Sequence, residues 1–125
     1  MKKIESVKEA FALENLDPDK IEITGVPERH VDALKALAEL FVVVDAVNSE
    51  FNPDYKNPNQ RKYEPFWEMG SPSGSGFSFD VFDYWHSASY VGARLVSENR
   101  EATEYIAEKF PDLYKRFMVY DRKVE

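Results

Sequence analysis

The segment Phe77–Trp85 constrains the fold more than any other part of this sequence, because apolar and polar side chains alternate along it. Successive side chains of a β-strand point to opposite faces, so the alternation predicts a strand with one face in the core. Ser78 and Asp80 fall on the opposite, polar face. The predicted core face carries every second residue, namely Phe77, Phe79, Val81, Asp83 and Trp85.

Two further strands are predicted beside this one. Arg61–Met69 has strand composition, with a bulge or break at Pro65, whose missing N–H cannot join a ladder. Residues 70–76 are rich in Gly and Ser, as expected of a flexible hairpin loop. A turn at residues 86–89 leads into the third predicted strand, Tyr90–Val96. The three segments predict an antiparallel meander.

Two helices are predicted before the strands. Ser6 and Glu9 form a capping box, which predicts a short helix over residues 7–15. The second helix starts at Pro27 and carries apolar side chains at helical spacing. Its three valines, residues 42–44, favour a strand by propensity, but the continuous apolar stripe favours the helix.

One long helix is predicted after the strands, capped by Ser97 and apolar on one face from Ala102 to Phe117. Proline inside a helix removes an amide and clashes with the preceding turn, so we expect a kink or break between Lys109 and Pro111. The predicted fold is therefore α+β with the order α-α-β-β-β-α. Its three-stranded antiparallel meander is covered on one face by the second and last helices.

The length and charge of the chain narrow its class. A chain of 125 residues is the size of one domain, so we expect a single α+β domain over residues 1–125, with 1–5 and 121–125 frayed. The formal net charge of −7 disfavours binding to nucleic-acid phosphates. The absence of cysteine excludes disulfides, thiolate catalysis and cysteine zinc sites.

The apolar segments are short. The first residues, Met1-Lys2-Lys3-Ile4-Glu5, lack the apolar stretch of a secretory signal. The longest apolar run, Leu40–Val44, is too short to span a bilayer. We therefore expect a cytoplasmic protein with no membrane partner.

Five motifs, in this order and spacing, are similar to those of a known domain family. They are Ala46-Val47-Asn48, Asn52-Pro53-Asp54-Tyr55, Lys62-Tyr63-Glu64-Pro65-Phe66, Gly92-Ala93-Arg94-Leu95 and Glu104-Tyr105-Ile106-Ala107-Glu108-Lys109-Phe110. Over Pro27–Tyr120 the chain resembles a small uncharacterised domain associated with Bacteroides-type gut bacteria and their phages or integrated mobile elements. The resemblance implies a prophage or mobile-element origin. No activity is assigned to that family, so no functional residue carries over.

Two positions depart from the family pattern. Val96 stands where relatives often place a cysteine, so thiol chemistry is not a requirement here. Pro111 interrupts a last helix that is usually continuous in the family, which puts the shape of the C-terminal segment in question.

The polar residues form no catalytic or metal constellation. On a strand, Asp80 and His86 would lie roughly 20 Å apart, at ~3.3 Å per residue, with Asp83 on the other face. His30 has no Ser or Cys nucleophile motif nearby, and the glycines of residues 70–76 do not precede a helix. We therefore predict no catalytic residue, no metal and no cofactor, and we favour a non-enzymatic role.

The aromatic residues of the strands are the remaining feature. Rings on a solvent-facing sheet surface would form a binding surface. The candidate binding residues are Tyr63, Trp67, Tyr84, Trp85, Tyr90 and Arg94. The first hypothesis is a protein-interaction or accessory module that binds a protein partner or self-associates.

Two alternatives stay open. One is a small-ligand or enzymatic pocket between the meander and the helices, in which Arg94 acts with Asp80, Asp83 or Glu64. The other is a nucleic-acid-binding module with an aromatic platform, which the acidic charge disfavours.

Overall fold

The structure is a computed structural model that describes residues 1–70, 76–85 and 93–120, with the backbone alone for residues 81–85 and 93. These residues form four α-helices and one two-stranded antiparallel sheet, so the α+β class is confirmed. The elements are α1 (Val7–Ala12), α2 (Val31–Val47), β1 (Lys62–Glu68), β2 (Ser78–Trp85), α3 (Arg100–Lys109) and α4 (Pro111–Met118). Short 3₁₀ turns lie at Pro18–Lys20, Glu28–His30 and Ala93–Leu95.

Helix α1 begins at the predicted capping box. The Glu9 amide donates to Ser6 Oγ at 3.0 Å, while the Glu9 carboxylate accepts from the Glu5 amide at 2.9 Å. The helix is shorter than predicted because Asn15 adopts a positive φ of 58°. The Leu16 amide then donates back to the Phe11 carbonyl, which closes the helix in a Schellman arrangement.

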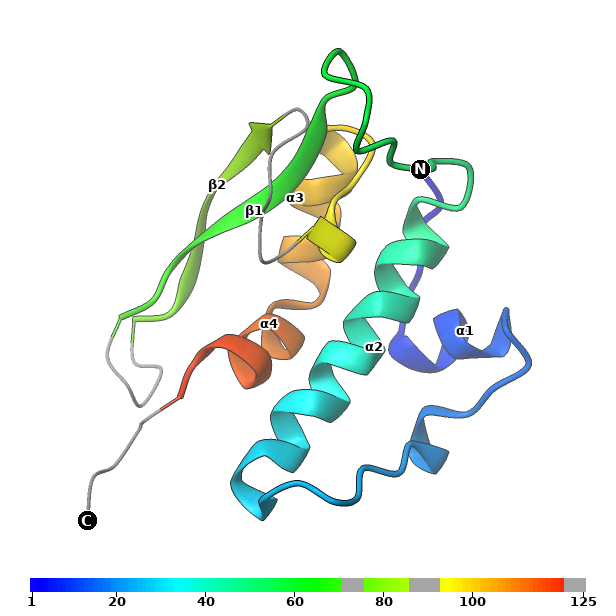
Figure 1. The fold of residues 1–125 in the computed structure, drawn as a ribbon, viewed down its shortest axis with the longest axis vertical. Coiled ribbons are helices and arrows are strands. Elements are labelled where there is room, and N and C mark those ends of the chain that lie inside the picture. The colour runs from blue at the N-terminus through cyan, green and yellow to red at the C-terminus, as the bar shows by residue number, and fades with distance from the viewer. Residues whose placement is uncertain (71–75, 86–92, 121–125) are drawn as a thin grey trace.

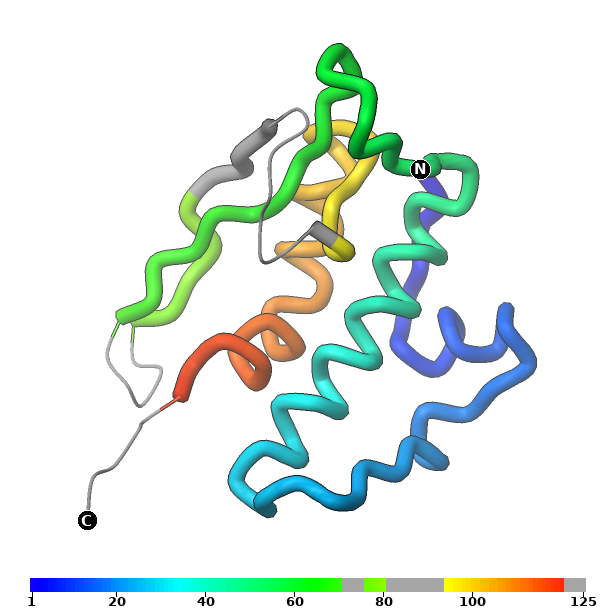
Figure 2. Tube along the Cα trace, viewed as in Figure 1, coloured from blue at the N-terminus to red at the C-terminus, as the bar shows by residue number. Residues whose placement is uncertain are grey.

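Residues 1–5, which we expected to fray, are anchored to two helices. Figure 2 shows this segment running back along α2 before it enters α1. The Lys2 amide donates to the Val47 carbonyl at 2.9 Å, and the Tyr105 hydroxyl donates to the Ile4 carbonyl at 2.8 Å. The Ile4 side chain is fully buried, so it belongs to the core.

Helix α2 runs through the three valines whose propensity favours a strand. Val43, Val44 and Val47 are all buried, and the helix packs against α1, α3 and α4. Burial of apolar side chains on several sides outweighs a weak helix propensity. The prediction of a helix over this segment is confirmed.

Strands β1 and β2 form the predicted hairpin, but Pro65, where a bulge or break was predicted, pairs with Phe82, and the bulge lies opposite the step from Phe66 to Trp67. Phe66 pairs with Val81 and Trp67 pairs with Phe79, so Asp80 has no partner in β1. A bulge resets the alternation of faces along a strand. Of the core face predicted for residues 77–85, the described side chains are those of Phe77 and Phe79, which are half-buried, and the side chains of Val81, Asp83 and Trp85 lie outside the described part.

The predicted third strand is not found in the described residues. Ala93–Leu95 forms a 3₁₀ turn, and residues 90–92 lie outside the described part. The nearest strand-like contact is a bridge in which Tyr63 and Ser97 exchange both backbone hydrogen bonds, at 3.1 and 2.7 Å. Because it uses both backbone groups of Tyr63, this bridge lies on the edge of β1 opposite β2, which is not meander topology.

The last predicted helix is two helices. Its N-cap is Asn99, whose Oδ1 accepts from the Ala102 amide at 2.9 Å, and not Ser97, which serves the bridge to β1. Phe110 has a non-helical φ of −126° and ψ of 44°, and α4 starts at Pro111, where a missing N–H does no harm. The predicted break at this proline is confirmed.

The elements form layers that place a groove between sheet and helix. Figure 1 shows the hairpin along one side of the molecule and α2 with α1 along the other, with α3 and α4 between them. Helix α3 packs on both strands, and α4 packs mainly on α2. The cover of the sheet thus comes from the first half of the predicted last helix, whereas α2 lies behind it.

Candidate functional site: a groove between β1 and α4

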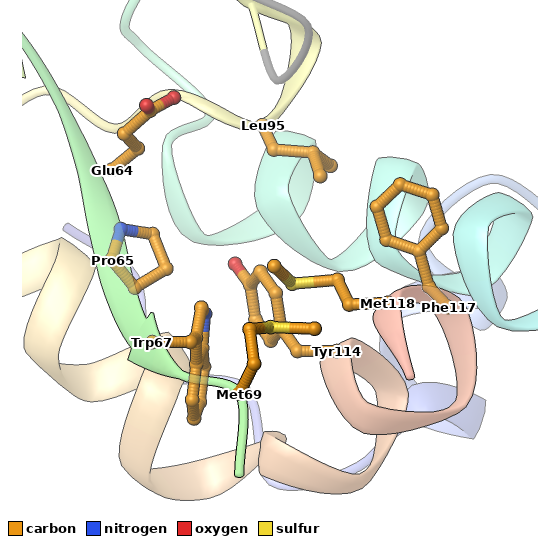
Figure 3. Close-up of a pocket in the computed structure, with 8 residues that line it drawn as sticks. All are labelled: Glu64, Pro65, Trp67, Met69, Leu95, Tyr114, Phe117 and Met118. Carbon is orange, nitrogen blue, oxygen red and sulfur yellow. The ribbon is translucent and has the colours of Figure 1, made fainter. Parts of the chain in front are cut away.

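An apolar groove with a volume of about 420 Å³ opens between β1 and α4 (Figure 3). This volume lies within the range of small-molecule pockets, roughly 300–1,000 Å³. Glu64 is the only charged residue among the described residues that line it. The lining residues are Glu64, Pro65, Trp67, Met69, Leu95, Tyr114, Phe117 and Met118.

Trp67 forms the β1 wall of the groove. Its side chain is 7% exposed, and its ring stacks on Phe77 at a centroid distance of 4.9 Å. Phe79 meets the ring edge-on at 5.6 Å, and Tyr114 lies against it at 5.0 Å. Three aromatic rings therefore pack against the indole. The indole Nε1 is buried and has no hydrogen-bond partner among the described residues.

Tyr114 forms the α4 wall, and its hydroxyl points into the groove (Figure 3). The side chain is 3% exposed. Burial raises the pKa of Tyr114, and the nearby Glu64 carboxylate raises it further. The tyrosine is therefore a neutral hydroxyl at physiological pH, able to donate one hydrogen bond.

Flexible apolar side chains complete the groove. Met69 is 41% exposed, and Met118 and Phe117 are half-buried. Leu95, from the 3₁₀ turn, is buried on the far side. Unbranched methionine side chains adapt to ligands of different shape, so the groove is suited to an apolar occupant.

A charged clamp holds α4 against α2. The Arg116 guanidinium donates to Asp32 at 2.9 Å and to Glu39 at 3.2 Å, two residues of α2. The Arg116 hydrogen bond is the main reason why the pKa of Asp32 lies below its usual value. Near this clamp the ring of His30 lies 5.5 Å from that of Tyr120. The wall of the groove is thus fixed to the longest helix.

Only two of the candidate aromatic residues, Tyr63 and Trp67, have side chains in the described part of the chain, and neither of these two is exposed. Trp67 is a core residue that lines the groove, and Tyr63 is half-buried beside the Ser97 bridge. Tyr84 and Trp85 belong to β2, but the structure describes only their backbone. Tyr90 lies outside the described residues altogether. The exposed ring of β1 is Phe66, at 52%, which was not among the candidates.

Arg94 lies at a different place from the predicted pocket. Its guanidinium sits over the Phe41 ring, 4.6 Å from the centroid, beside a small cavity of about 160 Å³ that Asp45 also lines. Burial raises the pKa of Asp45, and the positive charge of Arg94 opposes that rise. The acidic neighbour of Arg94 is therefore Asp45 of α2, whereas Asp80 is exposed on β2.

The groove brings together residues that sequence reasoning kept apart. Glu64 was weighed only as a partner of Arg94, and Tyr114 and Phe117 were placed on an apolar helix face. Met69 and Leu95 were named only as the end of a predicted strand and as part of a family motif, and Met118 was not named. The break at Pro111 was the one available signal, because it separates the direction of α4 from that of α3.

The described ranges contain neither a candidate metal-binding cluster nor a candidate membrane-spanning helix. No group of three His, Asp or Glu side chains there could hold a metal ion, and His86 lies outside them. No helix within these ranges has the length and apolar character needed to cross a bilayer.

Comparison with known proteins adds no family. No family model matches the chain, and neither a curated protein nor a solved structure matches it. The resemblance to the domain of gut bacteria and their phages stays a prediction. The functional argument therefore rests on the geometry of the groove.

Proposed function

We propose that this protein binds a small, largely apolar molecule in the groove between β1 and α4. The observation that carries the proposal is a concave apolar site of about 420 Å³ with the Tyr114 hydroxyl directed into it. Apolar walls with few convergent polar groups are the usual composition of ligand sites. The groove corresponds to the open alternative of a pocket between sheet and helices, without Arg94.

The walls are built to persist without a ligand. Trp67 is held between Phe77 and Tyr114, and α4 is held by the Arg116 clamp. A preformed site spends little binding energy on ordering side chains, which favours a ligand of modest size. The exposed Met69 and the half-buried Met118 provide the adaptable part of the rim.

The test is a titration with N-phenylnaphthylamine, a neutral apolar dye whose fluorescence rises in apolar sites. We expect saturable binding that Met118→Glu weakens by at least about tenfold, because burying an unpaired carboxylate beside the ligand costs more than about 1.4 kcal/mol. Phe66→Glu is the matched control, since it adds the same charge at an exposed position outside the lining.

The two variants decide the matter if circular dichroism shows that both are folded. Equal dye affinity for Met118→Glu and the original chain would place the dye elsewhere and refute the proposal. The absence of saturable binding to the original chain would refute it as well.

A second candidate function is self-association or binding of a protein partner through the outer face of the hairpin. The 52% exposure of Phe66 favours it. It ranks second because isolated exposed apolar side chains are common on monomers. The same control variant bears on it, since Phe66→Glu would then lower the mass measured by light scattering. A cytoplasmic location and a mobile-element origin are also proposals, supported by the short apolar segments and by the resemblance described above.

A further inference from the structure

We propose that the molecule bound in the groove is electrically neutral and carries a hydrogen-bond acceptor, such as an ester or ketone carbonyl, that meets Tyr114. This inference rests on the proposed function and specifies the class of ligand for that same site. It follows from three properties of the lining: its charge, its donors and its occupied aromatic faces.

The charge of the lining argues against an anionic ligand. None of the eight lining residues that the structure describes is Lys, Arg or His, and Glu64 is acidic. Its negative charge acts at the Tyr114 hydroxyl, because it contributes to the raised pKa of Tyr114. A carboxylate ligand would lose its hydration in an apolar site without gaining a cation, which is a costly exchange.

The hydrogen-bond donors in the groove favour a ligand that carries a hydrogen-bond acceptor. The Tyr114 hydroxyl points into the space, and the Trp67 indole N–H beside it has no partner among the described residues. Because the indole nitrogen is closed off from solvent, a ligand meets the hydroxyl first. A buried donor gains free energy when a ligand supplies an acceptor that the apolar walls cannot.

The occupied rings argue against a cationic ligand. Recognition of an ammonium group by aromatic residues needs an open ring face. The Trp67 ring packs against Phe77 and Tyr114 and is 7% exposed, and Tyr114 is 3% exposed, so neither Trp67 nor Tyr114 offers an open ring face. The Glu64 carboxylate is directed away from Trp67 and Met69 in Figure 3, so it lies at one end of the groove and not at its centre. A neutral ligand satisfies all three properties.

The experiment compares three probes with closely similar alkyl chains, methyl octanoate, octanoate and octylamine, by displacement of N-phenylnaphthylamine. We expect methyl octanoate to bind at least about tenfold more tightly than either charged probe. Tyr114→Phe should weaken methyl octanoate by about twofold to tenfold, the value of one hydrogen bond, and leave the dye, which has no strong acceptor, unchanged. Glu64→Gln should raise the affinity for octanoate.

The outcomes separate this inference from the function on which it rests. If the dye binds in the groove but octanoate or octylamine binds as tightly as the ester, the neutral-ligand inference is overturned and the groove remains a binding site. If Tyr114→Phe weakens ester and dye alike, the hydroxyl is not the donor. If neither dye nor probe binds, both proposals fall.

Discussion

Replacement of Asn48 by alanine should destabilise this protein more than any exposed asparagine does. Asn48 follows α2, and its side chain is 5% exposed. Its side-chain Nδ2 donates to the Val44 carbonyl at 2.9 Å and to Ser97 Oγ at 3.0 Å. Its side-chain Oδ1 accepts from the Glu98 backbone amide at 2.8 Å. The side chain therefore ties the end of α2 to the residues that bridge β1.

The size of the effect follows from these bonds. The Val44 carbonyl still accepts a hydrogen bond from the Asn48 backbone amide, so losing the bond from the Asn48 side chain costs this carbonyl little free energy. Ser97 and Glu98 lose a partner at buried or half-buried positions. Each hydrogen bond is worth about 1 kcal/mol net, and a stranded buried group costs about 1–3 kcal/mol. We expect Asn48→Ala to lower the free energy of unfolding by about 2–4 kcal/mol.

Urea denaturation followed by circular dichroism measures this difference. The matched control is Asn57→Ala, because Asn57 is exposed and its side-chain Oδ1 accepts from the Asn59 amide at 2.9 Å. Its loss should be about 0.5 kcal/mol, as for most surface changes. A loss for Asn48→Ala no larger than that of the control would refute the reasoning that this amide joins α2 to the bridge.

Two further changes test the helix ends and the α2–α4 clamp. Ser6→Ala should lower the free energy of unfolding by about 1 kcal/mol, read from the urea midpoint, because the Glu9 amide loses its cap; no midpoint shift would mean that the cap contributes nothing. The Arg116 hydrogen bond lowers the pKa of Asp32 below 3.8, so its stabilisation is present above that pH and is lost as the pH falls through the lower, folded value. Asp32→Asn should therefore reduce stability at neutral pH by less than about 1 kcal/mol, since the pair is exposed, and the difference from the original chain should vanish in acid. A difference that persists unchanged in acid would show that the carboxylate charge plays no part.

Local signals in the sequence predict much of this fold. The capping box at Ser6, the helix through residues 42–44, the two hairpin strands and the break at Pro111 all come from short-range chemistry. Capping, proline geometry and apolar periodicity act within a few residues, so a single sequence displays them. That is why these elements could be predicted.

Non-local choices account for what was missed. The bulge that leaves Asp80 unpaired depends on register against β1, and the bridge of Ser97 depends on where a distant turn returns. The role of Asn48 could not be seen in the sequence, because Ser97 and Glu98, two of its three side-chain partners, lie on a segment that only the tertiary structure brings near. Likewise, nothing in the order of residues joins Trp67 to Tyr114, so the lining of the groove could not be predicted, although a pocket between sheet and helices was one of the open alternatives.

The non-helical backbone at Phe110 decides whether this chain has the groove between β1 and α4. Had helical dihedrals continued through Phe110, the residues after it would extend the axis of α3 and follow the sheet instead of turning toward α2. Tyr114 would then lie farther along the axis of α3, and Trp67 would face only the preceding turns of that helix. The shape of the groove is thus determined less by the side chains that line it than by the change of direction at Phe110 and Pro111.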